Sequence, residues 1–96
     1  MMRSNKSPFP FGQRVIITPA AHNALTQAGE SVERYVQRFA TKDWGEVSAE
    51  QRTSNDTAES TSSPVLGVYV TSIGTSIQIM TFADRSRTTV MLVGEI

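Results

Sequence analysis

The spacing of the hydrophobic residues changes near Pro64, from the 3.6-residue period of a helix to the two-residue period of a strand. Before this point, the clearest helical stripe comprises Val32, Tyr35, Val36, Phe39 and Ala40. After it, apolar residues alternate with polar or smaller ones through the remaining third of the chain. Helices followed by strands predict an α+β domain, in which helices cover one face of an antiparallel sheet.

Three strands are predicted after Pro64, joined by a turn at Gly74 and a second turn at Asp84-Arg85-Ser86. Turns this short predict a three-stranded antiparallel meander. The stripe of Tyr35, Val36 and Phe39 is expected to pack on it. The residues expected to face that stripe are Leu66, Val68, Val70, Ile77, Ile79, Val90 and Leu92. The strand order stays open at this point.

The N-terminal half is predicted to hold one strand and two or three helices. A β-branched run over Arg14 to Thr18 indicates the strand. Whether this strand joins the sheet or stands apart stays open at this point. Thr18 followed by Pro19 is typical of a helix start, and Gly29 is a plausible stop. A second helix is expected to begin after Ser31.

Ser48 and Gln51 fit a capping box for a third helix, which is expected to be short and mostly exposed. Residues 59–64 are expected to form a Ser/Thr-rich loop. Residues 1–10 are interpreted as a flexible arm, and residues 11–96 as a single domain.

Composition restricts the classes of function. Nine basic and nine acidic residues cancel, whereas a general nucleic-acid binder has a basic face. The absence of cysteine excludes disulfides and thiolate chemistry. No apolar stretch approaches the length of roughly 20 residues that spans a bilayer. The polar N-terminus does not have the apolar region of a signal peptide, so a cytoplasmic protein without a membrane partner is expected.

Charged residues lie next to predicted helices or strands in two places, at Asp43-Trp44-Gly45-Glu46 and at the turn that contains Asp84. If Asp43, Glu46 and Asp84 converged, they would suit acid–base chemistry or a hard metal ion. The favoured interpretation is that Asp43 and Asp84 bond to their own turns and that Glu46 is solvated. Trp44 is expected to plug the edge of the core, with an interface anchor as the alternative.

The arginines give a second candidate surface, formed by Arg34, Arg38, Arg85 and Arg87. These residues suit an anion or nucleic acid, although arginines beside acids more often form exposed ion pairs. The single histidine, His22, has no neighbouring acidic or metal-ligating residue on its helix. Known catalytic motifs, such as a nucleophile elbow, a P-loop or a His-Glu-x-x-His helix, do not occur. We therefore expect no catalysis, cofactor or metal, with a small carboxylate- or metal-dependent hydrolase as the rival.

An ordered set of short motifs resembles a family of small proteins carried on bacterial plasmids, phages and other mobile elements. The motifs are Phe11-Gly12-Gln13, Thr18-Pro19-Ala20, Asp43-Trp44-Gly45-Glu46, Asn55-Asp56, Gly74-Thr75, residues 77–81, residues 83–86 and Thr88-Thr89. The resemblance covers roughly residues 9 to 92, and members are mostly uncharacterised. Some carry a label that links them to type I restriction-modification subunits.

The mobile-element resemblance, the balanced charge and the absence of catalytic motifs together favour a non-enzymatic binding module of a mobile element, acting on a host or element-encoded protein. Interference with a defence system such as restriction or CRISPR is the most concrete form. The alternative is an accessory nucleic-acid binder that uses the arginines, and the oligomeric state stays open. The residues expected to form the contact surface are Asp43, Trp44, Glu46, Asp84, Arg85 and Arg87.

Overall fold

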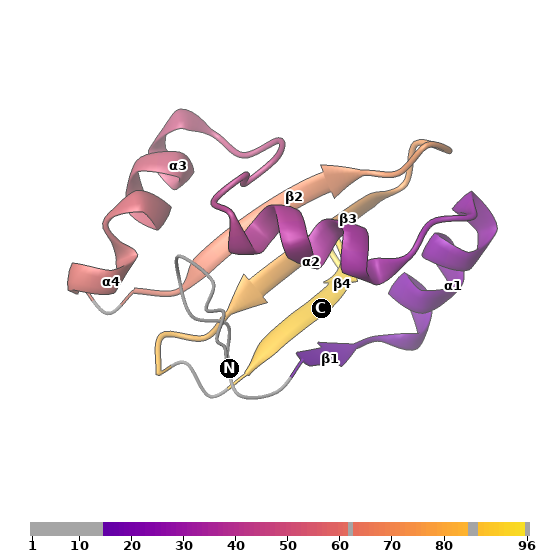
Figure 1. Cartoon of the computed structure of the whole chain (residues 1–96), viewed down its shortest axis with the longest axis horizontal. Helices are drawn as coiled ribbons and strands as arrows, with labels where there is room; N and C mark the ends of the chain where they lie inside the picture. Colours follow the sequence, from indigo (N-terminus) through magenta and orange to yellow (C-terminus); the bar gives the residue numbers. More distant parts are fainter. Residues whose placement is uncertain (1–14, 62, 85–86, 96) are drawn as a thin grey trace, which may run out of the picture.

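The structure is a computed structural model that describes residues 15–61, 63–84 and 87–95 (Figure 1). The predicted arm at residues 1–10 and the turn residues Arg85 and Ser86 lie outside this part of the chain. The elements in chain order are β1 (Val15–Ile17), α1 (Pro19–Ala28), α2 (Val32–Ala40), α3 (Ala49–Asp56), α4 (Ala58–Thr61), β2 (Val65–Val70), β3 (Ser76–Thr81) and β4 (Thr88–Leu92).

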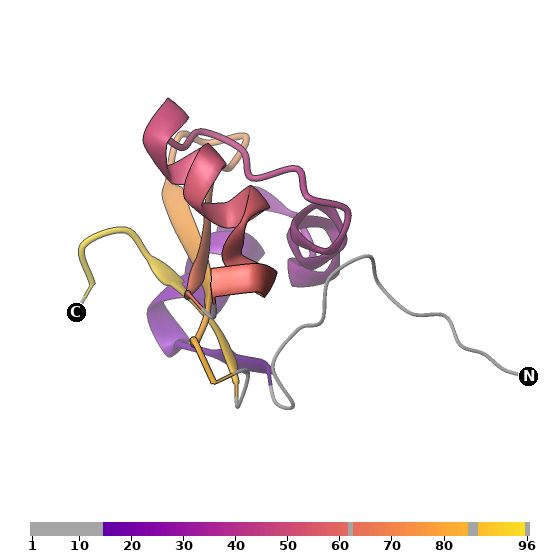
Figure 2. The ribbon, with the colours of Figure 1, turned by 90° about the vertical axis from the view of Figure 1, so that its left-hand side faces the viewer.

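The predicted α+β architecture is confirmed. Strands β2, β3 and β4 form an antiparallel meander, and β1 joins it as a parallel neighbour of β4, giving the sheet order β1-β4-β3-β2. Helix α2 crosses one face of the sheet, α1 lies at one end and α3 and α4 at the other (Figure 1). In the side view, α2 lies on one side of the sheet and the last described residues on the other (Figure 2).

Most of the predicted core is confirmed. Tyr35 and Phe39 of α2 are buried, as are Ile77, Ile79 and Val90 of the meander. Leu92 and Val36 are partly buried and pack against the same cluster. The apolar stripe of α2 therefore covers the face of β3 and β4 that the alternation predicts.

The predicted face of β2 is wrong. Val65, Gly67 and Tyr69 face the helices, whereas Leu66, Val68 and Val70 lie on the opposite side. Both faces of this strand are apolar, so the alternation alone does not choose between them. Burial of the large Tyr69 ring decides the orientation, because an aromatic ring removes more apolar area from water than a valine does.

Local signals at the helix ends explain most of the boundaries. The Thr18 hydroxyl accepts a hydrogen bond from the Ala21 amide, and Gly29 ends α1 at φ +70°. The Ser48 hydroxyl caps α3 through the Gln51 amide. The loop predicted for residues 59–64 is partly wrong, because α4, which begins at the fully buried Ala58, occupies its first half. No helix in the described residues is long and apolar enough to cross a membrane.

Candidate functional site

The segment containing Asp43, Trp44, Gly45 and Glu46 runs along the outer edge of β2. The Val68 amide donates to the Trp44 carbonyl at 3.0 Å, and the Glu46 amide donates to the Val68 carbonyl at 2.7 Å. These bonds form a parallel bridge between Gly45 and Val68. The edge strand therefore pairs with the chain's own loop at this position.

Trp44 lies inside the core at 3% exposure. Its ring meets Phe39 edge to face, with centroids 5.4 Å apart, and its indole N–H donates to Asp56 Oδ1 at 3.1 Å. This geometry satisfies both the apolar and the polar part of the side chain. The tryptophan thus plugs the core, and in this conformation its ring is not at the surface where a partner would contact it.

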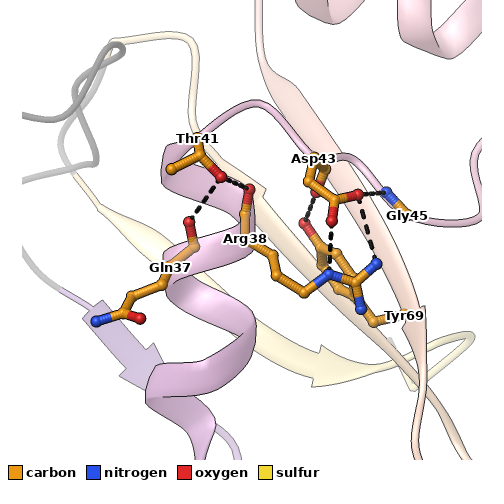
Figure 3. Close-up of polar contacts among 6 residues, drawn as sticks. All are labelled: Gln37, Arg38, Thr41, Asp43, Gly45 and Tyr69. Atoms are coloured by element: carbon orange, nitrogen blue, oxygen red, sulfur yellow. Dashed lines mark hydrogen bonds and ion pairs between the residues drawn. The ribbon is translucent and has the colours of Figure 1, made fainter.

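Asp43 is held by three neighbours (Figure 3). Its carboxylate accepts from Arg38 Nε at 2.7 Å and from the Gly45 amide at 3.2 Å. Its carbonyl oxygen accepts from the Tyr69 hydroxyl at 2.8 Å. The Arg38 guanidinium in turn lies over the Tyr69 ring, 4.9 Å from the centroid. A turn residue, a helix residue and a strand residue therefore fix one another.

The charges of this cluster support one another. The Arg38 hydrogen bond holds the pKa of the Asp43 carboxyl below its ordinary value, and the same bond raises the pKa of Arg38. Burial raises the pKa of the Tyr69 hydroxyl, so this group stays a neutral donor. The Arg38 and Asp43 side chains remain 42% and 50% exposed. The cluster is thus an ordered charge pair at the surface.

Asn55 is a contributor that the sequence reasoning did not single out as a site residue. It is 5% exposed, and its amide donates to the Leu66 carbonyl at 2.7 Å and accepts from the Leu66 N–H at 3.1 Å. Gln51 donates a third bond to the same side chain at 2.9 Å. The Asn55 side chain therefore makes the two backbone hydrogen bonds at Leu66 that a neighbouring strand would make. Leu66 lies two residues before Val68, where the loop forms its bridge to β2.

We expect Asn55→Ala to lower the free energy of unfolding by about 1–3 kcal/mol, because the Leu66 amide and carbonyl lose their partner. Urea denaturation followed by circular dichroism measures the change. Ser54→Ala, on the exposed side of the same helix, is the control, with an expected change within about 0.5 kcal/mol. Equal stabilities of the two variants would contradict the role of Asn55 at this edge.

Glu30 joins the α1–α2 connection to the β2–β3 hairpin. Its carboxylate accepts from the Tyr35 hydroxyl at 2.5 Å and from the Ser72 amide at 3.2 Å. Arg34 lies 3.9 Å away. The Tyr35 hydrogen bond is the main cause that lowers the pKa of Glu30. These contacts therefore link the N-terminal end of α2 to the β2–β3 hairpin.

The lowered pKa values of Glu30 and Asp43 predict loss of stability in acid. A carboxyl whose pKa is lower in the folded state contributes stability above its ordinary pKa, near 4, which is lost as the pH falls through the folded value. We expect Glu30→Gln and Tyr35→Phe each to flatten this decline, because the first removes the titrating carboxyl and the second removes the hydrogen bond that lowers its pKa. Urea midpoints measured from neutral pH to about pH 3 test this. Slopes equal to that of the unmodified protein would contradict it.

The second predicted cluster lies elsewhere on the sheet. Asp84 and Arg87 are exposed in the β3–β4 connection, Arg85 lies outside the described residues, and the Arg87 guanidinium lies 4.3 Å from the Phe82 ring centroid. Gly45 is level with Val68, which pairs with Gln78. Phe82, the first residue of the β3–β4 connection, lies four residues after Gln78. At the rise of a strand, this is a distance of about 13 Å along the direction of β3.

The structure therefore separates the consecutive residues Asp43, Trp44 and Gly45 from Asp84 by the width of two strands and this length. Among the described residues, no group of three or more His, Asp or Glu side chains is arranged to hold a metal ion. The Asp43 carboxylate already has Arg38 as its partner. The geometry suits recognition by fixed charges.

Comparisons with protein-family models, with curated proteins and with solved structures found no match. The relation to proteins of mobile elements therefore rests on the short sequence motifs and stays a prediction. In the structure, the motif at residues 43–46 supplies the β2 bridge, the core plug and the charge pair.

Tyr69 was also missed as a member of this site. The sequence feature that could have indicated it is a glycine two residues before the tyrosine, on the same face of β2. A Cβ on Gly67 would lie 2.5 Å from the Tyr69 hydroxyl oxygen. The missing side chain at Gly67 leaves room for the ring, and the hydroxyl reaches the Asp43 carbonyl.

Proposed function

We propose that this chain is a non-enzymatic binding module of a mobile element that acts by contact with a host or element-encoded protein. Interference with a host defence system, such as restriction or CRISPR, is the form suggested by the sequence resemblance. The proposed contact surface, called here the α2-side surface, is centred on the Arg38–Asp43 pair and includes the exposed residues Arg34 and Glu46, each within four residues of that pair in the sequence.

The observation that carries this proposal is the ordered but exposed pair of Arg38 and Asp43. Stacking on Tyr69 and the bond from Gly45 fix both side chains before any partner arrives. Because Arg38 and Asp43 are already ordered, they lose little side-chain entropy when a partner binds, so fixed charges of this kind favour specific recognition. Arginine is also enriched in protein interfaces.

The pairing of Arg38 also bears on the nucleic-acid alternative. Asp43 neutralises the arginine that would contact a phosphate, while Arg34, one turn earlier, stays 65% exposed. Arg87 belongs to the β3–β4 connection, which lies away from α2 in both ribbon views (Figures 1 and 2). Contacts to a partner of mixed charge therefore fit this surface better than a row of phosphates does.

The test is an affinity capture from a host lysate, with and without nuclease, at low and physiological salt. We expect a protein partner that survives nuclease, is lost with Glu46→Lys and binds more weakly with Asp43→Asn. Asn23→Lys, an exposed change on α1, is the matched control and should retain the partner.

The protein-binding proposal fails if every captured partner disappears with nuclease. A steep loss of affinity between low and physiological salt, together with retained DNA or RNA, would instead favour the nucleic-acid binder. Each variant is first checked by circular dichroism, so that loss of binding is separated from loss of the fold.

A further inference from the structure

The guanidinium of Arg38 has one edge bound inside the protein and a second edge that is left for a ligand. Its Nε and Nη2 atoms donate to the two oxygens of the Asp43 carboxylate, at 2.7 and 3.4 Å. Its flat face lies over the Tyr69 ring. The third nitrogen, Nη1, is directed away from the carboxylate (Figure 3), and no described residue accepts a hydrogen bond from it. The edge formed by Nη1 and Nη2 is therefore fixed in position and open.

An edge of this kind matches a group that has two acceptor oxygens. The two parallel N–H donors of a planar guanidinium bind a carboxylate or a phosphate in a bidentate manner. In most surface arginines the side chain must first be ordered, and this cost cancels much of the gain. Asp43 and Tyr69 have already fixed the plane of Arg38, so little rotamer freedom is lost when a ligand binds.

Lys42, directly after α2, is a second cation of this surface and has a strained backbone. It is exposed, and no acidic side chain of the described residues pairs with it. Its φ is +69°, in the left-handed region that glycine ordinarily occupies after a helix. The end of a helix favours a cation, but Arg38 already supplies one in the last turn. A lysine in a position that favours glycine is thus a second indication that the surface receives a negatively charged group.

Arg52 of α3 brings a further positive charge to the same surface. The pKa of the Asp43 carboxyl is lowered mainly by the Arg38 hydrogen bond, and the Arg52 charge adds to this effect. Arg52 is exposed, and no acid within the described part of the chain forms an ion pair with it. Lys42 and Arg52 are therefore both available to an external anion.

We propose that Arg38 and Lys42 bind a carboxylate side chain of the partner protein, whose two oxygens meet the Nη1–Nη2 edge of Arg38. A phosphate offers the same pair of oxygens, but in a nucleic acid the neighbouring phosphates would meet the carboxylates of Asp43 and Glu46. A single carboxylate on a protein avoids this repulsion. The inference rests on the proposed function, because it names the group that the partner presents to the α2-side surface.

The first test needs no natural partner. The full chain is titrated with N-acetyl-tetraglutamate amide, against sodium chloride of the same ionic strength, and the Arg38 Nε–H and Lys42 amide signals are followed by NMR. We expect saturable shifts of both signals at millimolar peptide, because exposed charge pairs are weak. Arg38→Lys keeps the charge and removes the fork, so it should weaken binding at least about threefold. Arg87→Lys makes the same change at an arginine that lies over Phe82, away from α2, and should leave binding unchanged.

Lys42→Gly separates binding from folding. Glycine removes the backbone strain, so the urea midpoint should rise, whereas loss of the ammonium group should weaken binding of the peptide. A lysine with a purely structural role would not give these opposite changes. Circular dichroism first confirms that each variant is folded.

Three results of the titration overturn the proposal. They are the absence of a saturable shift at Lys42, equal binding of the peptide by Arg38→Lys and the unmodified chain, and shifts of the same signals by sodium phosphate or a single-stranded oligonucleotide at lower concentration than the peptide. The last result would assign the edge to phosphate.

The second test uses the protein partner captured from the lysate. A water-soluble carbodiimide joins a lysine amine to a carboxylate in contact with it, and the chain has only two lysines, Lys6 and Lys42. We expect mass spectrometry to find Lys42 linked to an aspartate or glutamate of the partner. A partner linked through Lys6 alone overturns the carboxylate assignment and leaves the proposed function intact. If no protein is captured, the proposed function fails, and the peptide titration alone decides whether the Arg38 edge binds a carboxylate.

Discussion

Gly45→Ala is expected to lower the free energy of unfolding by at least about 3 kcal/mol, a large part of the 5–15 kcal/mol of a small domain. A Cβ at this position would lie 2.0 Å from the Val68 carbonyl oxygen and 2.8 Å from the Tyr69 ring. The residue also has φ +74°, which an alanine adopts only with strain. The loop would have to leave the β2 edge, so the bridge at Val68 would be lost.

Gly29→Ala separates the two causes. Gly29 has nearly the same backbone angle, φ +70°, and a Cβ there meets nothing within 4 Å. Its cost should be only the backbone strain, about 1–2 kcal/mol. Urea denaturation of both variants measures the difference. If Gly45→Ala costs no more than Gly29→Ala, the close approach of the loop to β2 is contradicted.

Trp44→Ala is expected to cost about 3–5 kcal/mol, because it empties a core position and leaves Asp56 without its indole partner. Trp44→Phe keeps a ring against Phe39 and loses the hydrogen bond, so a cost of about 1–2 kcal/mol is expected. Circular dichroism in urea is the measurement, since Trp44 is the only tryptophan and its fluorescence is lost in both variants.

The two tryptophan variants also separate a structural role from a binding role. A core plug predicts that partner capture falls only to the extent that the folded fraction falls. A Trp44→Ala protein of unchanged stability that fails to capture a partner would contradict the structural assignment.

The elements that the sequence predicted well are those that depend on local signals. The α2 stripe places Tyr35 and Phe39 one turn apart, Thr18 and Pro19 start α1, and Gly74 turns the β2–β3 hairpin at φ +86°. Each of these needs only residues a few positions apart, so the linear sequence contains the required information.

The elements that it did not predict depend on contacts between distant residues. The face of β2 is chosen by Tyr69, whose hydroxyl bonds to a carbonyl 26 residues away. Asn55 pairs with Leu66 across 11 residues, and nothing in the polar run around it indicates a buried amide. In the candidate site, Asp43 and Trp44 stood out by residue type, but their partners are set by tertiary packing.

The parallel pairing of β1 with β4 has a consequence for the order in which the protein folds. It joins residues near the two ends of the chain, Val15 with Thr88, whereas β2, β3 and β4 are neighbours in sequence. Closing the long loop between β1 and β4 costs more entropy than closing the short turns of the meander. In exchange, β1 forms only three residue pairs, and Val15 and Ile16 stay exposed. The meander should therefore form first and β1 dock last. In the folded protein, the Thr18 amide bonded to Val90 should exchange its hydrogen sooner than the amides of β3.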